Sequence, residues 1–186
     1  MSLDDATTAT RSPAHHGVRA RRVVSGLDAR GRSVIVVDEE SSVTSTLPAF
    51  TCNDVWRAVH VPTRFDADEL GAELEFAPPA GGITVRLVTF PPDGHVDRAS
   101  YSETIDRFHG HELNTRPDAE VVGMHAMDTV DVDTVVSGEI WCVFDSGQET
   151  LLRQGDTIIN RGTTHAWSNR SDAAATVVAT IIPVRD

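Results

Sequence analysis

Residues 155–169 read Gly-Asp-Thr-Ile-Ile-Asn-Arg-Gly-Thr-Thr-His-Ala-Trp-Ser-Asn, and this stretch carries the most specific pattern in the chain. Gly155 permits a tight turn, and Gly162 permits a second turn after a short run of strand-forming residues. His165 follows on the returning strand, where the alternation of side chains can point it inward. The stretch therefore predicts two strands joined by a turn, with His165 directed toward the interior of a β-protein.

Short strand-forming runs continue on both sides of this stretch, separated by turn sequences such as Ser146-Gly147. In the last third of the chain they cover residues 134–136, 139–144, 149–152, 157–159, 165–168 and 176–182. Earlier candidates are a hairpin over 23–37 and strands over 54–61 and 82–90. Short strands at near-even spacing are typical of a sandwich or barrel, so we expect an all-β fold with one barrel.

One segment departs from the β pattern. Ser100 and Glu103 are spaced as a capping box, and apolar residues then recur at helical spacing as far as Phe108. The pattern predicts a short helical insertion within the barrel.

The two glycines, His165 and Asn169 of residues 155–169 are spaced as in the second conserved motif of the cupin superfamily, which this stretch closely resembles. It also contains a run similar to the Arg-Gly-Thr-Asn-His-Ala-Trp signature of small single-domain cupins, with Thr164 at the Asn position. The resemblance is good over residues 123–183 and loose over the earlier strands. It implies a cupin-type β-barrel, a double-stranded β-helix or jelly roll.

The resemblance also implies ligands from an earlier cupin motif, which has two histidines one residue apart, then an acid and a glycine. Counting back from Gly138 places His125 at the first histidine, Met127 at the second and Asp131 at the acid. Residues 125 and 131 share one face of an extended strand, so both can converge with His165. Two imidazoles and one carboxylate suit Fe(II), Mn, Ni or Zn. We therefore expect a divalent metal ion at His125, Asp131 and His165.

Several alternatives stay open at this site. Met127 admits three interpretations: an apolar pocket wall, a thioether ligand that favours Cu(I), or a barrel that has lost its metal. A bulge would exchange Asp131 with Asp128, which is a second candidate for the acid. His165 could instead be a satisfied core histidine. Trp167 is expected to line the pocket, with core packing as its alternative.

Two further histidines, His109 and His111, lie in the insertion between Pro92 and Met124. We expect residues 92–123 to form a lid, from which His109 or His111 reaches the pocket as an acid–base group or substrate contact. The alternative is a solvated loop.

Composition limits the partners of this 186-residue chain. It has 16 Lys and Arg against 28 Asp and Glu, a net charge of −12, which argues against nucleic acid. No apolar run approaches the ~20 residues that span a bilayer, and residues 1–11 lack the apolar stretch of a signal peptide, so we expect a cytoplasmic protein without a membrane partner. Residues 1–20 are expected to be a disordered tail before a single domain over 21–186, with a core barrel over 82–184.

Two functions follow from these expectations. The first is a metal-dependent enzyme that acts on a small polar organic substrate by dioxygenation, decarboxylation, dehydration or isomerisation. The second, favoured by Met127, is a non-catalytic protein that binds a small molecule without metal. The cupin resemblance further implies a homodimer, in which residues 22–37 would pack on the neighbouring sheet.

Overall fold

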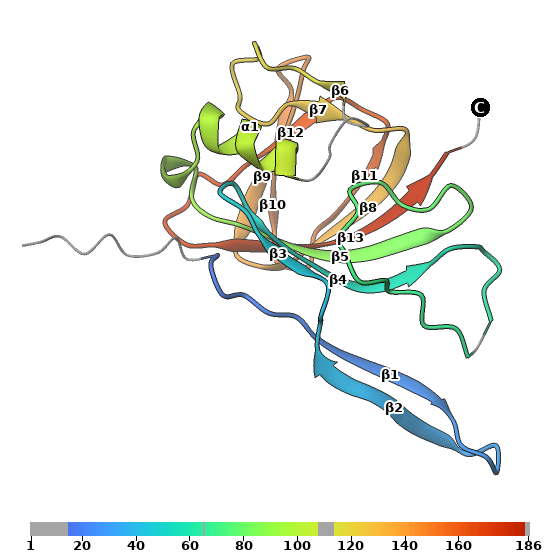
Figure 1. Cartoon of the computed structure of the whole chain (residues 1–186). Helices are drawn as coiled ribbons and strands as arrows, with labels where there is room; N and C mark the ends of the chain where they lie inside the picture. The colour runs from blue at the N-terminus through green and yellow to red at the C-terminus, as the bar shows by residue number, and fades with distance from the viewer. Residues whose placement is uncertain (1–14, 65, 108–113, 185–186) are drawn as a thin grey trace, which may run out of the picture.

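The computed structural model describes residues 15–64, 66–107 and 114–184 (Figure 1). Within these residues the strands form three sheets, and every pairing between named strands is antiparallel. A two-stranded sheet pairs β1 (Arg21–Leu27) with β2 (Ser33–Glu40). A five-stranded sheet has the order β10-β9-β12-β7-β6, and a six-stranded sheet has the order β11-β8-β13-β5-β4-β3. The bounds of their strands are β3 (Thr44–Thr46), β4 (Thr51–Ala58), β5 (Ile83–Phe90), β6 (Asn114–Thr115), β7 (His125–Ala126), β8 (Thr129–Ser137), β9 (Glu139–Phe144), β10 (Glu149–Arg153), β11 (Thr157–Arg161), β12 (His165–Ser168) and β13 (Ala175–Pro183).

The two larger sheets pack face to face around a shared apolar core. One cluster joins Val135 and Val177 of the six-stranded sheet to Ile140, Cys142 and Leu152 of the five-stranded sheet. Burial of these aliphatic side chains between the sheets removes apolar surface from water, which is the main force that holds the layers together. This arrangement confirms the expected all-β, cupin-type barrel.

The strands expected in the last third of the chain are all present. Residues 139–144 and 165–168 coincide with β9 and β12, whereas the strand expected over 134–136 is the end of the longer β8. β8 extends back to Thr129 because it pairs on both sides, with β11 and with β13. Its first half contains Asp131 and Asp133, residues with low strand propensity, so the backbone pairing decides this part of the strand.

Two strands that precede the core expected over residues 82–184 belong to the six-stranded sheet. They are β3 and β4, and β4 pairs with β5. β4 covers Thr51–Ala58 instead of residues 54–61. Its buried residues Asn53 and Asp54 are polar, so the first half of the strand has no apolar run that would predict it.

The tail expected over residues 1–20 is docked from His15 onward. The His15 side chain is fully buried, and its Nδ1 lies 3.0 Å from Thr51 Oγ1. Thr51 Oγ1 donates to the His15 carbonyl at 2.9 Å, and Asn53 binds the backbone of Val18 and Ala20. Polar side chains on β4 therefore hold this segment against the barrel, which its composition did not predict.

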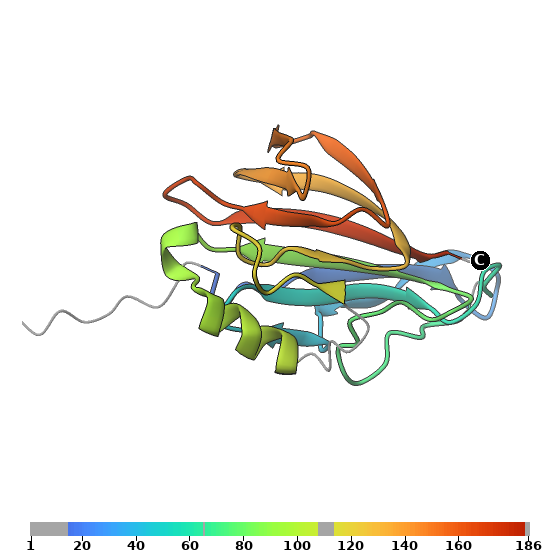
Figure 2. The same cartoon turned by 90° about the horizontal axis from the view of Figure 1, so that it is seen from above.

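The helical insertion is confirmed, but it begins earlier than its sequence pattern indicated. α1 covers Arg98–Arg107, and Ser100 N donates to Asp97 Oδ1 at 2.8 Å, so Asp97 is the capping side chain instead of Ser100. Glu103 pairs with Arg107 at 2.5 Å and does not complete a capping box. α1 lies along one side of the barrel (Figure 2). In the described part of the chain, no helix is long and apolar enough to cross a membrane.

The β1–β2 hairpin, predicted over 23–37, extends away from the barrel (Figure 1). It carries exposed apolar side chains, among them Leu27, Ile35 and Val36. The segment expected to form a dimer contact is thus accessible in the single chain, and the dimer itself stays a prediction.

Candidate functional site

The barrel encloses a cavity of about 430 Å³ between its two sheets and α1. Five residues singled out from the sequence line it together: His125, Met127, Asp131, His165 and Trp167. Strand pairing brings them together, because β7 and β12 are neighbours in one sheet and β8 belongs to the other. His109 and His111 lie outside the described residues.

The two histidines face each other across neighbouring strands. His125 and His165 are paired in register, and their ring centroids are 4.8 Å apart at an interplanar angle of 46°. In each ring Nδ1 bonds a backbone carbonyl two residues earlier, Gly123 O at 2.7 Å and Thr163 O at 2.9 Å. A carbonyl only accepts, so Nδ1 carries the proton and Nε2 keeps its lone pair. The pair therefore offers two imidazole acceptors.

Burial keeps both imidazoles uncharged. It lowers the pKa of His125 to about 4, with a further contribution from the neighbouring His165. Burial also lowers the pKa of His165. Neutral imidazole is the form that binds metal ions and accepts hydrogen bonds, so both side chains are ready for either role at neutral pH.

Two carboxyl groups from β8 line the same cavity. Asp131 Oδ1 is buried and has no hydrogen-bond partner among the described residues, and burial raises the pKa of this group. Asp133 is 4% exposed and accepts a hydrogen bond from Asn160 Nδ2 at 3.0 Å. Burial, followed by the charge of Asp131, raises the pKa of Asp133 to about 7. Asp128 is exposed and lies outside the cavity lining, so the register of β8 selects Asp131.

The expected three-ligand set is only partly assembled. Within residues 15–64, 66–107 and 114–184, no three His, Cys, Asp or Glu side chains are grouped closely enough to hold a metal ion. His125 and His165 form a matched pair of donors, and Asp131 lines the same cavity with an unpartnered oxygen. Met127, at the position of the expected second histidine, lines the cavity as well. The two imidazoles are donors of the kind that a metal site uses, and Asp131 is the remaining candidate ligand.

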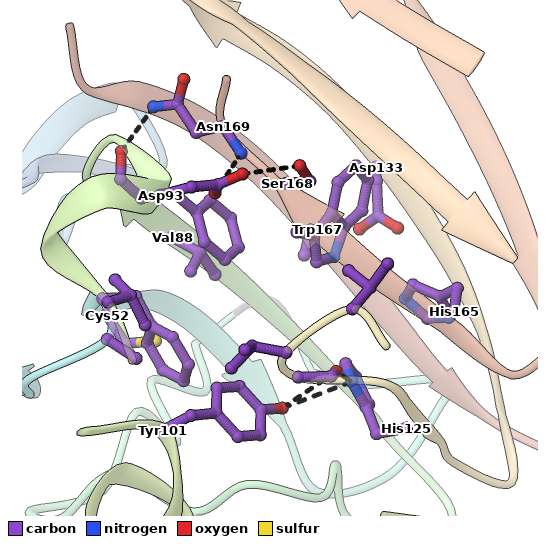
Figure 3. Close-up of a pocket in the computed structure, with 18 of the residues that line it drawn as sticks. Cys52, Val88, Asp93, Tyr101, His125, Asp133, His165, Trp167, Ser168 and Asn169 are labelled. Carbon is purple, nitrogen blue, oxygen red and sulfur yellow. Dashed lines mark hydrogen bonds between the residues drawn. The ribbon is translucent and has the colours of Figure 1, made fainter. Parts of the chain in front are cut away.

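α1 contributes a tyrosine that the sequence analysis did not select. Tyr101 Oη donates to Gly123 O at 3.2 Å and lies 3.4 Å from His125 Nδ1 (Figure 3). The helix itself is fixed to the barrel, since Thr104 Oγ1 accepts a hydrogen bond from Ala49 N at 3.0 Å. Tyr101 thus closes one side of the cavity and contacts the carbonyl that orients His125.

A buried ion pair also borders the cavity. Arg86 Nε and Nη2 donate to the two oxygens of Asp54 at 2.5 and 3.1 Å, and both side chains are 3% exposed. Arg86 further donates to the carbonyls of Glu75 and Phe76. In the first half of β5, Thr84 and Arg86 are buried, whereas the apolar residues between them are only partly buried.

The sequence contained signals for some of these missed residues. Asp133 lies two residues after Asp131, so the same alternation that selects Asp131 also directs Asp133 into the barrel. Tyr101 and Arg86 had no comparable signal, because helix docking and strand pairing bring them to the cavity from distant parts of the chain.

Comparison with known proteins shows which proteins this chain is similar to. No protein-family model matches the chain. The chain is 42% identical over 62 residues to phomopsin biosynthesis cluster protein C′ of Diaporthe leptostromiformis, an alignment that covers 33% of this chain and 32% of that protein. It is 28% identical over 159 residues to the cupin-domain-containing oxidoreductase srdB of Neurospora crassa, covering 81% of this chain and 66% of srdB. A solved structure of a putative ethanolamine utilization protein Q from Salmonella typhimurium aligns with a TM-score of 0.43 at 10% identity, over 91% of this chain and all of the other.

The antiparallel barrel and the sequence similarity relate this chain to cupin-domain proteins. The relatives that it matches include fungal cupin-domain-containing oxidoreductases and proteins of fungal biosynthesis clusters. The matches span about a third of the phomopsin protein and just under two thirds of the length of srdB.

Proposed function

We propose that this chain is a cupin enzyme of the oxidoreductase type, acting on a small organic molecule in the barrel cavity. In this proposal His125 and His165 hold a divalent metal ion, and Asp131 is the third ligand. The observation that carries the proposal is the pair of imidazoles with both Nδ1 atoms bound to backbone carbonyls. Such bonds fix the orientation of a metal-binding histidine and leave Nε2 as the donor.

A divalent ion bound there supplies a Lewis acid or a redox centre. The protein residues provide the remaining conditions for the reaction. The rigid cross-strand pair keeps two donors in place without reorganisation, and Tyr101 with Gly123 O keeps the His125 ring oriented. The apolar cavity walls exclude water and bind the body of the substrate.

The names of the relatives support the oxidoreductase class. Proteins named cupin-domain-containing oxidoreductases match at 28% and 26% identity over 81% of the chain. A fold hosts many reactions, so the class rests on these relatives and not on the barrel.

Metal content tests the proposal directly. The protein is purified without chelator or nickel resin, reconstituted with Fe(II), Mn, Ni or Zn in turn, and analysed by plasma mass spectrometry. We expect near-stoichiometric metal in the wild type and most of it lost in His125→Ala and His165→Ala. His165→Gln serves as a second variant that preserves side-chain bulk, and His60→Ala, at an exposed histidine outside the cavity, is the matched control. Unchanged metal content in both His165 variants would remove His165 from the site.

One observation favours a second candidate function, a non-catalytic small-molecule-binding protein. Met127 is an apolar part of the cavity wall at the position where a second histidine was expected. A wild-type protein that retains no metal after reconstitution, yet binds small molecules in the cavity, would favour this candidate over the enzyme.

A further inference from the structure

The charged groups of the cavity are mainly acidic. Asp93 and Glu120 are exposed lining residues and so belong to its rim, whereas Asp131 and Asp133 lie in its interior. The described lining of the cavity therefore contains four carboxyl groups. The two histidines each bind a backbone carbonyl through Nδ1.

The arginines near the cavity are already engaged. Arg86 is the cationic side chain in the described lining, and it is bound by Asp54 and by the carbonyls of Glu75 and Phe76. Arg98, next to the rim on α1, is not a lining residue, and its guanidinium binds backbone carbonyls that include Glu120 O at 3.1 Å. An incoming anion would meet carboxyl groups without an uncommitted guanidinium.

The uncharged lining is aromatic and aliphatic. Its aromatic members come from β5, β12, α1 and the segments that precede β4 and β5, and they are Phe50, Phe76, Phe90, Tyr101 and Trp167. The ring centroids of Phe90 lie 5.9 Å from Phe50 and 6.1 Å from Trp167, so these rings form a continuous apolar wall. Such a wall binds a flat or alkyl body by burial of apolar surface.

The polar end of the cavity accepts hydrogen bonds. Nε2 of His125 and of His165 keeps a lone pair, and Asp131 Oδ1 has no hydrogen-bond partner in the part of the chain that the structure describes. A hydroxyl group satisfies such acceptors, and its oxygen can also coordinate a metal ion. An ether oxygen cannot donate, and a carboxylate adds a charge that the exposed acids of the rim, Asp93 and Glu120, repel.

We propose that the cavity selects an uncharged molecule with an aromatic or aliphatic body and a hydroxyl group directed at the His125–His165 pair, and that in the absence of bound metal it rejects carboxylates. This proposal rests on the function proposed above, because it names the substrate class of the same cavity.

Three matched fluorescent probes test the selection: 2-naphthol, 2-methoxynaphthalene and 2-naphthoate. Dissociation constants are measured at pH 7 by fluorescence titration, with EDTA-treated protein and with metal-loaded protein. We expect 2-naphthol to bind most tightly, the methyl ether several-fold more weakly because it cannot donate, and naphthoate about ten-fold more weakly because of the carboxyl groups. A charge reversal at the rim, Glu120→Lys, should reduce the ratio of the naphthoate and naphthol dissociation constants several-fold. Glu40→Lys makes the same change on the distant hairpin strand β2 and should leave the ratio unchanged.

Each contrary outcome overturns a stated part of the proposal. Naphthoate that binds as tightly as naphthol to the EDTA-treated protein refutes the rejection of carboxylates. Equal binding of naphthol and its methyl ether refutes the hydroxyl requirement, and absence of binding by all three probes refutes the ligand class. The protein could retain no metal after reconstitution and still bind naphthol more tightly than the other two probes. That result would support the proposed ligand class and refute the metal site, so failure of one proposal can be told from failure of the other.

Discussion

Replacement of Asp133 by Asn should remove an acid that is unfavourable to ionise inside the barrel. The carboxyl group is 4% exposed, and its pKa rises from 3.8 to about 7 through burial and the nearby Asp131. The folded state therefore holds this proton more tightly than the unfolded state does. Its contribution to stability is fully present below pH 4 and is lost as the pH rises toward 7.

The structure gives the magnitude of this loss. A shift from 3.8 to about 7 corresponds to about 4 kcal/mol, since each pKa unit is worth about 1.4 kcal/mol. Roughly 3 kcal/mol of this falls between pH 4.5 and pH 8. In Asp133→Asn the amide oxygen can still accept from Asn160 Nδ2, so the local hydrogen bond is kept while the charge is removed. The free energy of unfolding of the variant, relative to that of the wild type, should therefore rise by roughly 3 kcal/mol between pH 4.5 and pH 8.

Urea unfolding followed by tryptophan fluorescence, in the presence of EDTA, measures the difference at each pH. The difference between variant and wild type cancels the contributions of all other titrating groups that the mutation leaves unchanged. Asp172→Asn, at an exposed acid in the loop before β13, is the control for the removal of a surface carboxyl group. A stability difference for Asp133→Asn that does not change with pH would show that Asp133 is not a buried acid with a raised pKa.

Two further substitutions test how the barrel is held together. Asp54→Ala leaves the buried Arg86 guanidinium without its carboxylate, so we expect a loss of about 3–5 kcal/mol in urea unfolding; a loss below 1 kcal/mol would mean that this pair is solvated in solution. Gly82→Ala would place a Cβ 1.7 Å from the Ala58 carbonyl oxygen, where backbone on both sides prevents relief. We expect a loss of about 3 kcal/mol, measured by thermal unfolding, and an unchanged melting temperature would contradict the close approach of β4 and β5.

The sequence alone determined the fold class and the central histidine. Residues 155–169 place two turn-forming glycines around a short strand, and this local pattern survives in the structure as β11, a turn and β12 with His165 at its start. These features depend on neighbours in the chain, which a sequence displays directly. The single extended strand expected to hold residues 125 and 131 does not form, because His125 lies on β7 of one sheet and Asp131 on β8 of the other. Both side chains still line the cavity, which lies between the two sheets.

Other features were decided by the tertiary structure. Arg86 and Asp54 are polar residues that composition places at the surface, yet pairing of β4 with β5 buries them together. His15 lies in a segment without any apolar period and becomes buried because hydroxyl and amide groups of β4 bind it. Tyr101 reaches His125 because α1 docks on the barrel. In each case a hydrogen-bond or charge partner from a distant part of the chain makes burial of a polar side chain favourable. Composition and local periodicity do not identify that partner.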